Sequence, residues 1–166
     1  MDQWSLGFKR VTPENWLSSD ETWRNIVGYM DEEDFAGWYA EVAAFELANA
    51  PKEVEALFAV AKTTFVYAWL FYPFLAVAAD HLYKVLEAAA RLKCVALGLE
   101  SRMSLDRTIT ALHKQGALSD DQARDWHTIR HLRNHASHPY FQTIQPPNMA
   151  VSALSDAHRM LNELFA

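Results

Sequence analysis

A helical pattern that runs from residue 51 to residue 98 with a single interruption most limits what this chain can fold into. Apolar residues recur there at spacings of three and four, which indicates amphipathic helix and not strand. Pro73 interrupts the pattern, because proline lacks the amide hydrogen that a helix interior needs. The helix that follows Pro73 is predicted to bury one set of residues: Leu75, Ala79, Leu82, Leu86, Ala89 and Leu97.

Two helices are predicted before this pattern. Thr12 followed by Pro13 is typical of a helix start, and the expected apolar face contains Trp16, Ile26 and Tyr29. The acidic run at residues 31–34 indicates a second helix start, because carboxylates are favourable at the N-terminal end of the helix dipole. That helix is predicted to continue to residue 49 with one apolar stripe: Phe35, Trp38, Tyr39, Val42 and Leu47.

Three helices are predicted after the pattern. Ser104 can cap a helix that ends at Gly116. Ser119 begins a capping-box pattern, so the next helix starts there and ends before Pro139. A final amphipathic helix covers residues 149–165. With only five glycines and six prolines in 166 residues, we expect an all-α chain, an up-and-down helical bundle that forms a single domain over residues 1–166.

Composition excludes several classes of protein. The uncharged stretch at residues 63–79 is shorter than the roughly 20 residues of a membrane span and contains a proline, so a buried helix is expected and no membrane partner. A net charge of -6 argues against a protein that coats nucleic acid through its overall charge. The only cysteine, Cys94, excludes an internal disulfide, is expected in the core and fits a cytoplasmic location.

Charged residues of the helix after Pro73 permit two interpretations. Asp80, Lys84, Glu87 and Arg91 stand three or four apart, so they lie on one side of the helix as neighbours of opposite charge. They form either a solvated face of ion pairs or a cleft in which Glu87 orients a basic residue of another helix.

The densest group of candidate functional residues lies near the end of the predicted helix that starts at Ser119. Four of the seven histidines fall between His127 and His138, together with Arg130 and Arg133. In an acidic chain, such a local excess of cationic and titratable groups indicates a site for an anion, a metal or a proton.

Metal binding and a purely structural role are two of the three possibilities. His127, His131 and His135 are four residues apart and share a helix face, a spacing that can chelate zinc. The glutamate of the metalloprotease helix is missing, however, and the neighbouring arginines would repel a cation, so we expect neither a metal nor another cofactor. Arginine and histidine also suit the C-terminal end of a helix dipole, which explains part of the cluster without any function.

Phosphodiester chemistry is the third possibility. Cleavage of RNA needs a base that accepts the proton of the ribose 2'-hydroxyl, and histidine has a suitable pKa. It also needs donors that hold the phosphate as charge builds on it, and the forked guanidinium of arginine is such a donor. The internal 2'-hydroxyl nucleophile would make RNA the substrate and not DNA.

The sequence from Arg133 to His138, RNHASH, resembles the Arg-x4-His motif of the HEPN superfamily. The similarity covers roughly residues 68–165 and includes Asn134 after the arginine, Pro139 after the histidine and an acidic residue, Glu87, on a preceding helix. Arg130 with His135 has the same spacing but lacks these neighbours. The resemblance implies a bundle of HEPN type over residues 51–166, with residues 1–50 as an N-terminal helical extension.

The resemblance also implies a function and the residues that carry it. The chain would be a metal-independent endoribonuclease whose product ends in a 2',3'-cyclic phosphate. The catalytic residues would be His138 as general acid and base, Arg133 on the phosphate, Asn134 as orienting group and Glu87 as the group that holds Arg133. Substrate contacts would come from further residues of the stretch: Arg130, His131, His135 and Tyr140.

The implied partners are RNA, a second copy of the chain in a homodimer with a shared cleft, and an antitoxin or phage-defence protein. Tyr140 is similar to a tyrosine that antitoxins modify by adenylylation in some HEPN toxins. The alternative is a non-catalytic HEPN-like module that binds RNA, a nucleotide or a protein.

Overall fold

The computed structural model describes residues 8–28, 31–100, 102–136 and 146–166. These residues form seven helices and no strand, so the prediction of an all-α chain is confirmed. The helices are α1 (Thr22–Val27), α2 (Glu32–Ala43), α3 (Lys52–Tyr67), α4 (Phe74–Ala96), α5 (Leu105–Lys114), α6 (Asp120–Ala136) and α7 (Pro147–Leu164).

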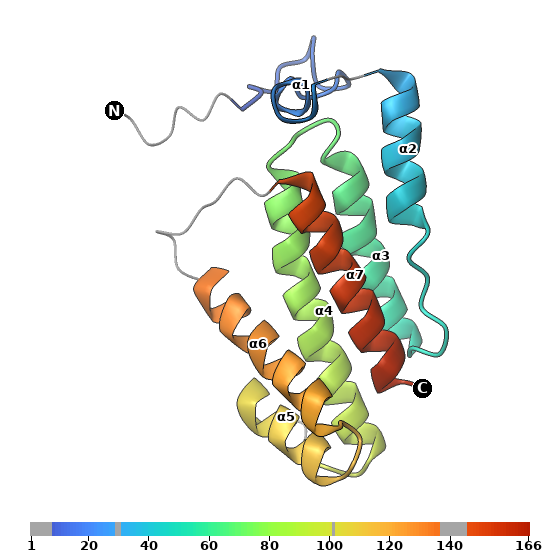
Figure 1. Ribbon diagram of the computed structural model, residues 1–166, viewed down its shortest axis with the longest axis vertical. Helices are drawn as coiled ribbons and strands as arrows, with labels where there is room; N and C mark the ends of the chain where they lie inside the picture. The colour runs from blue at the N-terminus through green and yellow to red at the C-terminus, as the bar shows by residue number, and fades with distance from the viewer. Residues whose placement is uncertain (1–7, 29–30, 101, 137–145) are drawn as a thin grey trace.

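Helix α4 is the centre of the bundle, where it contacts α3, α5, α6 and α7. The long helices α3, α4, α6 and α7 alternate in direction, and α5 lies across one end beside the start of α6 (Figure 1). Small residues on α4 let its neighbours approach closely, since Ala78, Ala89 and Ala90 are fully buried. Of the residues predicted for its buried side, only Leu97 is wrong: it follows the last residue of α4 and is 43% exposed.

Pro73 separates α3 from α4 as predicted, and the chain reverses direction between them (Figure 1). The uncharged stretch at residues 63–79 covers this reversal and contributes Phe65, Tyr72 and Leu75 to the core. Across the described part of the chain, every helix is too short or too polar to cross a membrane. The stretch is helical at both of its ends, where one face is buried and Tyr67 and Val77 are exposed, and residues 68–73 form the connection.

Three predicted helix starts are present with their hydrogen bonds. The carboxylate of Asp31 accepts from the amides of Glu33 and Asp34 at the start of α2, and Asp34 in turn accepts from the Asp31 amide at 2.8 Å. Ser104 accepts from the Arg107 amide at the start of α5. At the start of α6, the amide of Ser119 donates to the Gln122 side chain at 2.8 Å and the Ser119 hydroxyl accepts from the Gln122 amide at 3.3 Å.

The helix predicted from Thr12 is wrong. Residues 13–17 form turns, and within residues 8–28 the only helix is the short α1. Trp16 and Ile26, predicted to be apolar-face residues, are exposed, and Tyr29 lies outside the described residues. This segment does not continue as a helix from Thr12 because Asp20 is fully buried. The Asp20 carboxylate accepts a hydrogen bond from the Tyr72 amide at 2.8 Å.

Two tryptophans attach α1 and α2 to the C-terminal end of α3. The indole of Trp23 donates to the carbonyl of Ala68 at 2.8 Å, and that of Trp38 donates to the carbonyl of Phe65 at 2.9 Å. The last carbonyls of a helix lack their usual partners within it, and these indoles bond to two such carbonyls, although that of Phe65 also accepts from the Ala68 amide at 3.2 Å. The α2 stripe is confirmed only for Trp38 and Val42, because the helix ends at Ala43 and the other predicted members are more exposed.

Candidate functional site

An ion pair between α4 and α6 is the centre of the candidate site. One carboxylate oxygen of Glu87 accepts from Nη2 of Arg133 at 3.2 Å. The Glu87 side chain is 20% exposed and that of Arg133 is 44% exposed, so the pair lies at the edge of the interface between the two helices. The contact expected between Glu87 and the arginine of the motif is therefore present, while the catalytic roles of both residues stay a prediction.

Glu87 also takes part in an ion pair within α4. Its other carboxylate oxygen accepts from Nη2 of Arg91 at 2.7 Å, and Nη1 of Arg91 donates to the carbonyl of Met103 at 2.9 Å. The ion pair expected on the charged face of α4 is therefore present between Glu87 and Arg91, and Glu87 also pairs with an arginine of α6, while its orienting role in a cleft stays a prediction. Arg91 also connects this carboxylate to the segment before α5.

A second group of charges lies where the first turn of α5 meets α6. The same oxygen of Asp106 is 3.5 Å from Nε of Arg130 and 3.6 Å from Nδ1 of His127. Both nitrogens are buried and neither has a hydrogen bond within the described part of the chain, so the Asp106 carboxylate lies near both without a hydrogen bond to either. Nη2 of Arg130 lies 3.1 Å from Nε2 of His131, which makes Arg130 the link between Asp106 and the exposed side of α6.

The described residues give no support to the metal interpretation. No group of three histidine, cysteine, aspartate or glutamate side chains with the geometry of a metal site is found among them. His127 faces Asp106 and His131 contacts Arg130, so each of these rings has a neighbour of its own. The side chain of His135 lies outside the described residues.

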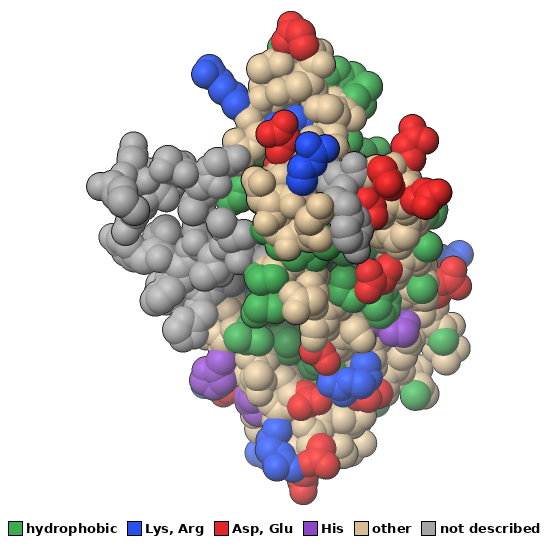
Figure 2. Space-filling model, turned by 45° about the horizontal axis from the view of Figure 1, so that its top comes forward, with side chains coloured by type: hydrophobic (Ala, Val, Ile, Leu, Met, Phe, Trp, Pro, Cys, Tyr) green, Lys and Arg blue, Asp and Glu red, His purple; other side chains and the backbone are tan. Residues whose placement is uncertain are grey.

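Five of the predicted site residues can be placed and three cannot. Glu87, Arg133 and Asn134 lie where α6 passes α4, and the Asn134 side chain accepts from Nη1 of Arg133 at 3.5 Å. Arg130 and His131 lie about one turn earlier on α6, in contact with each other and close to Asp106 of α5. His138 and Tyr140 lie in residues 137–145, outside the described residues. Histidine side chains are visible on the side of the molecule where α6 lies (Figure 2).

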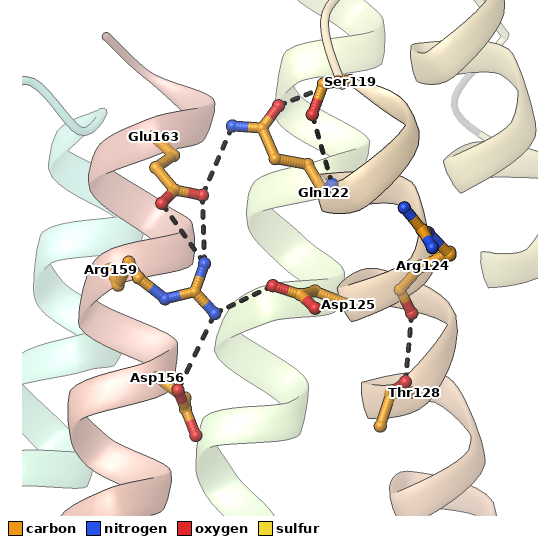
Figure 3. Close-up of polar contacts among 8 residues, drawn as sticks. All are labelled: Ser119, Gln122, Arg124, Asp125, Thr128, Asp156, Arg159 and Glu163. Carbon is orange, nitrogen blue, oxygen red and sulfur yellow. Dashed lines mark hydrogen bonds and ion pairs between the residues drawn. The ribbon is translucent and has the colours of Figure 1, made fainter.

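An arginine of α7 bonds to α6 and helps to hold it in place. Nη2 of Arg159 donates to Asp125 of α6 at 2.9 Å, and Nη1 donates to Glu163 one turn further along α7 at 3.2 Å (Figure 3). Gln122 extends the network by donating to Glu163 at 3.3 Å. The hydrogen bond to Asp125, as the larger cause, raises the pKa of Arg159. Helix α6 is therefore held by α7 through its N-terminal half and by Glu87 of α4 near its C-terminal end.

Sequence reasoning missed the carboxylate of Asp106 and two titratable residues of α4, His81 and Tyr83, although it placed Asp80 on the face of Glu87. Burial raises the pKa of Asp80, although Lys84 opposes this, and burial followed by the nearby Asp80 raises the pKa of Tyr83. Nε2 of His81 is buried without a hydrogen-bond partner in the described part of the chain. Asp80 precedes Glu87 by two turns, so the heptad spacing was a signal for its face, whereas no local pattern marks Asp106. Cys94 is fully buried as predicted, and burial raises the pKa of its thiol.

A comparison with protein-family models, curated proteins and solved structures finds no match to this chain.

Proposed function

We propose that the chain is a metal-independent endoribonuclease of HEPN type whose active centre is the end of α6. The observation that carries the proposal is the Glu87–Arg133 ion pair at 3.2 Å, which joins the acidic residue and the arginine of the motif across two helices 46 positions apart in the sequence. An arginine on a surface helix does not need a carboxylate partner on another helix for solubility. An ion pair of this kind is expected where the guanidinium must keep one orientation.

The reaction uses groups that the motif supplies. A base accepts the proton of the ribose 2'-hydroxyl, the 2'-oxygen forms a bond to phosphorus, and the bond from phosphorus to the 5'-oxygen breaks. The departing 5'-oxygen takes up a proton, so the products are a 2',3'-cyclic phosphate and a 5'-hydroxyl, without water or metal in this step. His138 is the proposed acid and base, and Arg133 stabilises the charge that builds on the phosphate.

The surroundings of Arg133 favour an anionic ligand. Arg130 and Arg133 lie on α6 where it meets α5 and α4, with Asp106 and Glu87 as their carboxylate partners. Arginines that are fixed by a carboxylate on one edge keep a defined orientation and can donate two parallel hydrogen bonds to two oxygens of a phosphate. Such a local cationic group is how an acidic chain can bind RNA at one place without binding nucleic acid in general.

The biological setting belongs to the same proposal. A cytoplasmic homodimer would bring two copies of the α6 end to one cleft, where a single RNA strand contacts both. A toxin or phage-defence effector of this kind would be controlled by an antitoxin or another defence protein. Asn134 would orient the motif, and His131, His135 and Tyr140 would contact the substrate.

Incubation of the protein with a mixed RNA in EDTA tests the proposal. We expect cleavage with 2',3'-cyclic phosphate ends, abolished by His138→Ala and by Arg133→Ala. Arg124→Ala is the matched control, because Arg124 also lies on α6, is paired with Asp121 and precedes Arg133 by nine residues, about 14 Å of helix. Arg124→Ala should retain full activity.

The outcomes separate the enzyme from its alternative. Cleavage that requires a divalent metal, or that survives His138→Ala, would contradict the nuclease. Binding of RNA that is lost in Arg133→Ala but never leads to cleavage would identify the non-catalytic module. A monomeric mass by light scattering would contradict the proposal that two copies of the chain share one cleft.

A further inference from the structure

An open groove between α2 and α3 has no role in the proposed nuclease. Its volume is about 840 Å³, and the turn before α1 forms its third side. Seven apolar or aromatic residues line it: Leu17, Phe35, Tyr39, Val66, Tyr67, Trp69 and Leu70. In Figure 1, α2 and α6 lie on opposite sides of the bundle, so the groove is remote from the Glu87–Arg133 pair.

The walls of the groove contain apolar side chains that are exposed to solvent. Leu17 is 64% exposed, Tyr39 54% and Tyr67 53%. The floor is ordered by contacts beneath it, where the ring of Trp69 packs against Phe35 at 5.7 Å and against the buried Trp23 at 5.4 Å. A fixed floor below exposed aromatic walls is typical of a surface that binds a partner, since scattered exposed residues do not converge on one cavity.

The rim of the groove is acidic. Asp31 and Glu32 line it, and no lysine or arginine occurs from residue 31 to residue 43. The other carboxylates of α2, Glu33, Asp34 and Glu41, line a separate hollow. Figure 2 shows acidic side chains gathered on the right, the side on which α2 lies in Figure 1. Two lysines come near, but Lys62 donates to the carbonyls of Ala43 and Phe45, and Lys9 donates to that of Leu70.

We infer that this groove binds a basic amphipathic helix of a partner protein. The apolar stripe of such a helix would fill the space between Tyr39 and Tyr67, and its lysines or arginines would face the carboxylates of Asp31 and Glu32. A second copy of this chain fits less well, because a symmetric contact through the groove would bring the acidic α2 of each copy close to the other. This inference does not depend on the nuclease.

A pair of model peptides tests the charge and shape of the occupant. The first is a helix of about four turns in which leucines recur at spacings of three and four among lysines, and the second replaces every lysine by glutamate. Fluorescence anisotropy of the labelled peptides gives the dissociation constants with the full-length protein. We expect the lysine peptide to bind, more weakly at high salt, and the glutamate peptide not to bind.

Matched variants of the protein locate the binding. Glu32→Lys and Tyr39→Lys should each raise the dissociation constant of the lysine peptide by about tenfold or more. Glu53→Lys is the charge control, because Glu53 is also in the first turn of a helix but lies outside the groove, and Val95→Lys is the control for an exposed apolar residue. Both controls should change the constant by less than about twofold, a free-energy difference of only some 0.4 kcal/mol.

Three results would overturn the inference. The glutamate peptide could bind as tightly as the lysine peptide, or the control variants could weaken binding as much as the groove variants do. Tyr39→Lys could instead lower the mass of the protein in light scattering, which would assign the groove to a second copy of the chain.

Discussion

Replacement of Glu87 by alanine tests whether the ion pairs of the candidate site orient Arg133 for activity or are ordinary surface ion pairs. The carboxylate makes two ion pairs, at 2.7 Å to Arg91 and 3.2 Å to Arg133, and its side chain is 20% exposed. Exposed pairs contribute about 0.2–1 kcal/mol, and buried hydrogen bonds to charged groups roughly 1.5–3 kcal/mol. An intermediate position gives a loss of about 1.5 kcal/mol for Glu87→Ala, or about 3–6 °C in melting temperature for a chain of this size.

The two partners of Glu87 should differ in their effect on RNA cleavage. Without Glu87 the guanidinium of Arg133 loses its orientation, and misplacement of a group that acts on the transition state costs up to about a hundredfold in rate. Arg91→Ala removes the other ion pair at a similar cost in stability, but Arg133 keeps its bond to Glu87. We therefore expect cleavage by Glu87→Ala to fall by about 10–100-fold and cleavage by Arg91→Ala to change by less than about threefold.

Urea denaturation of the two single variants and the double variant of Glu87 and Arg133 measures their coupling, and single-turnover cleavage measures the rate. A coupling energy of roughly 0.5–1 kcal/mol is expected, since the two residues are in direct contact. Coupling below about 0.2 kcal/mol would show that the contact contributes nothing in solution. If Arg91→Ala reduced cleavage as much as Glu87→Ala does, Glu87 would act through general stability and the orienting role would be refuted.

Three further predictions concern the parts of the fold that hold the site. Asp20→Ala should destabilise the protein by about 2–4 kcal/mol in urea denaturation, because two buried amides lose their acceptor, whereas its exposed neighbour Glu21→Ala should change stability little. Burial, and secondly Asp20, raises the pKa of Tyr72 from 10.0 to about 12. The folded state therefore keeps a proton on Tyr72 that the unfolded state loses. The stability that Tyr72 contributes should be complete below pH 10 and fall as the pH rises towards 12. Tyr72→Phe should reduce this decline in thermal melts. Arg159→Ala should cost roughly 1 kcal/mol by calorimetry, since its side chain is half exposed but bonds to α6 and α7 together, and Arg124→Ala should cost less.

Local signals were sufficient for most of the helices. Pro73 predicted the break between α3 and α4, and Ser104 and Ser119 predicted the starts of α5 and α6, because capping depends on residues within one turn of each other. The Glu87–Arg133 contact followed from the resemblance and not from any local pattern, since 46 residues separate the two. The HEPN-type arrangement of the bundle and the activity stay predictions.

The N-terminal part shows why the remaining features escaped prediction. Thr12 and Pro13 have the local chemistry of a helix start, but the buried carboxylate of Asp20 and the indole of Trp23 bond to backbone atoms of residues 72 and 68. These tertiary contacts outweigh the propensity of a few residues, and no spacing in the sequence indicates them. Asp106 escaped for the same reason, because its partners His127 and Arg130 belong to a different helix.

The way α6 is held explains why its C-terminal end is a good place for a reactive group. Arg159 bonds to Asp125 near the start of the helix, Asp106 faces His127 and Arg130 in its middle, and Glu87 bonds to Arg133 near its end. Three attachments to α7, α5 and α4 fix both the axis and the rotation of α6, whereas one attachment would leave the rotation open. A catalytic constellation must be held to within about 0.5 Å, which a helix supported along its length achieves better than a loop does. Arg130 and Arg133 therefore project from a helix that is held in place, and substitutions of Asp106 or Asp125 should weaken the proposed site without touching the motif itself.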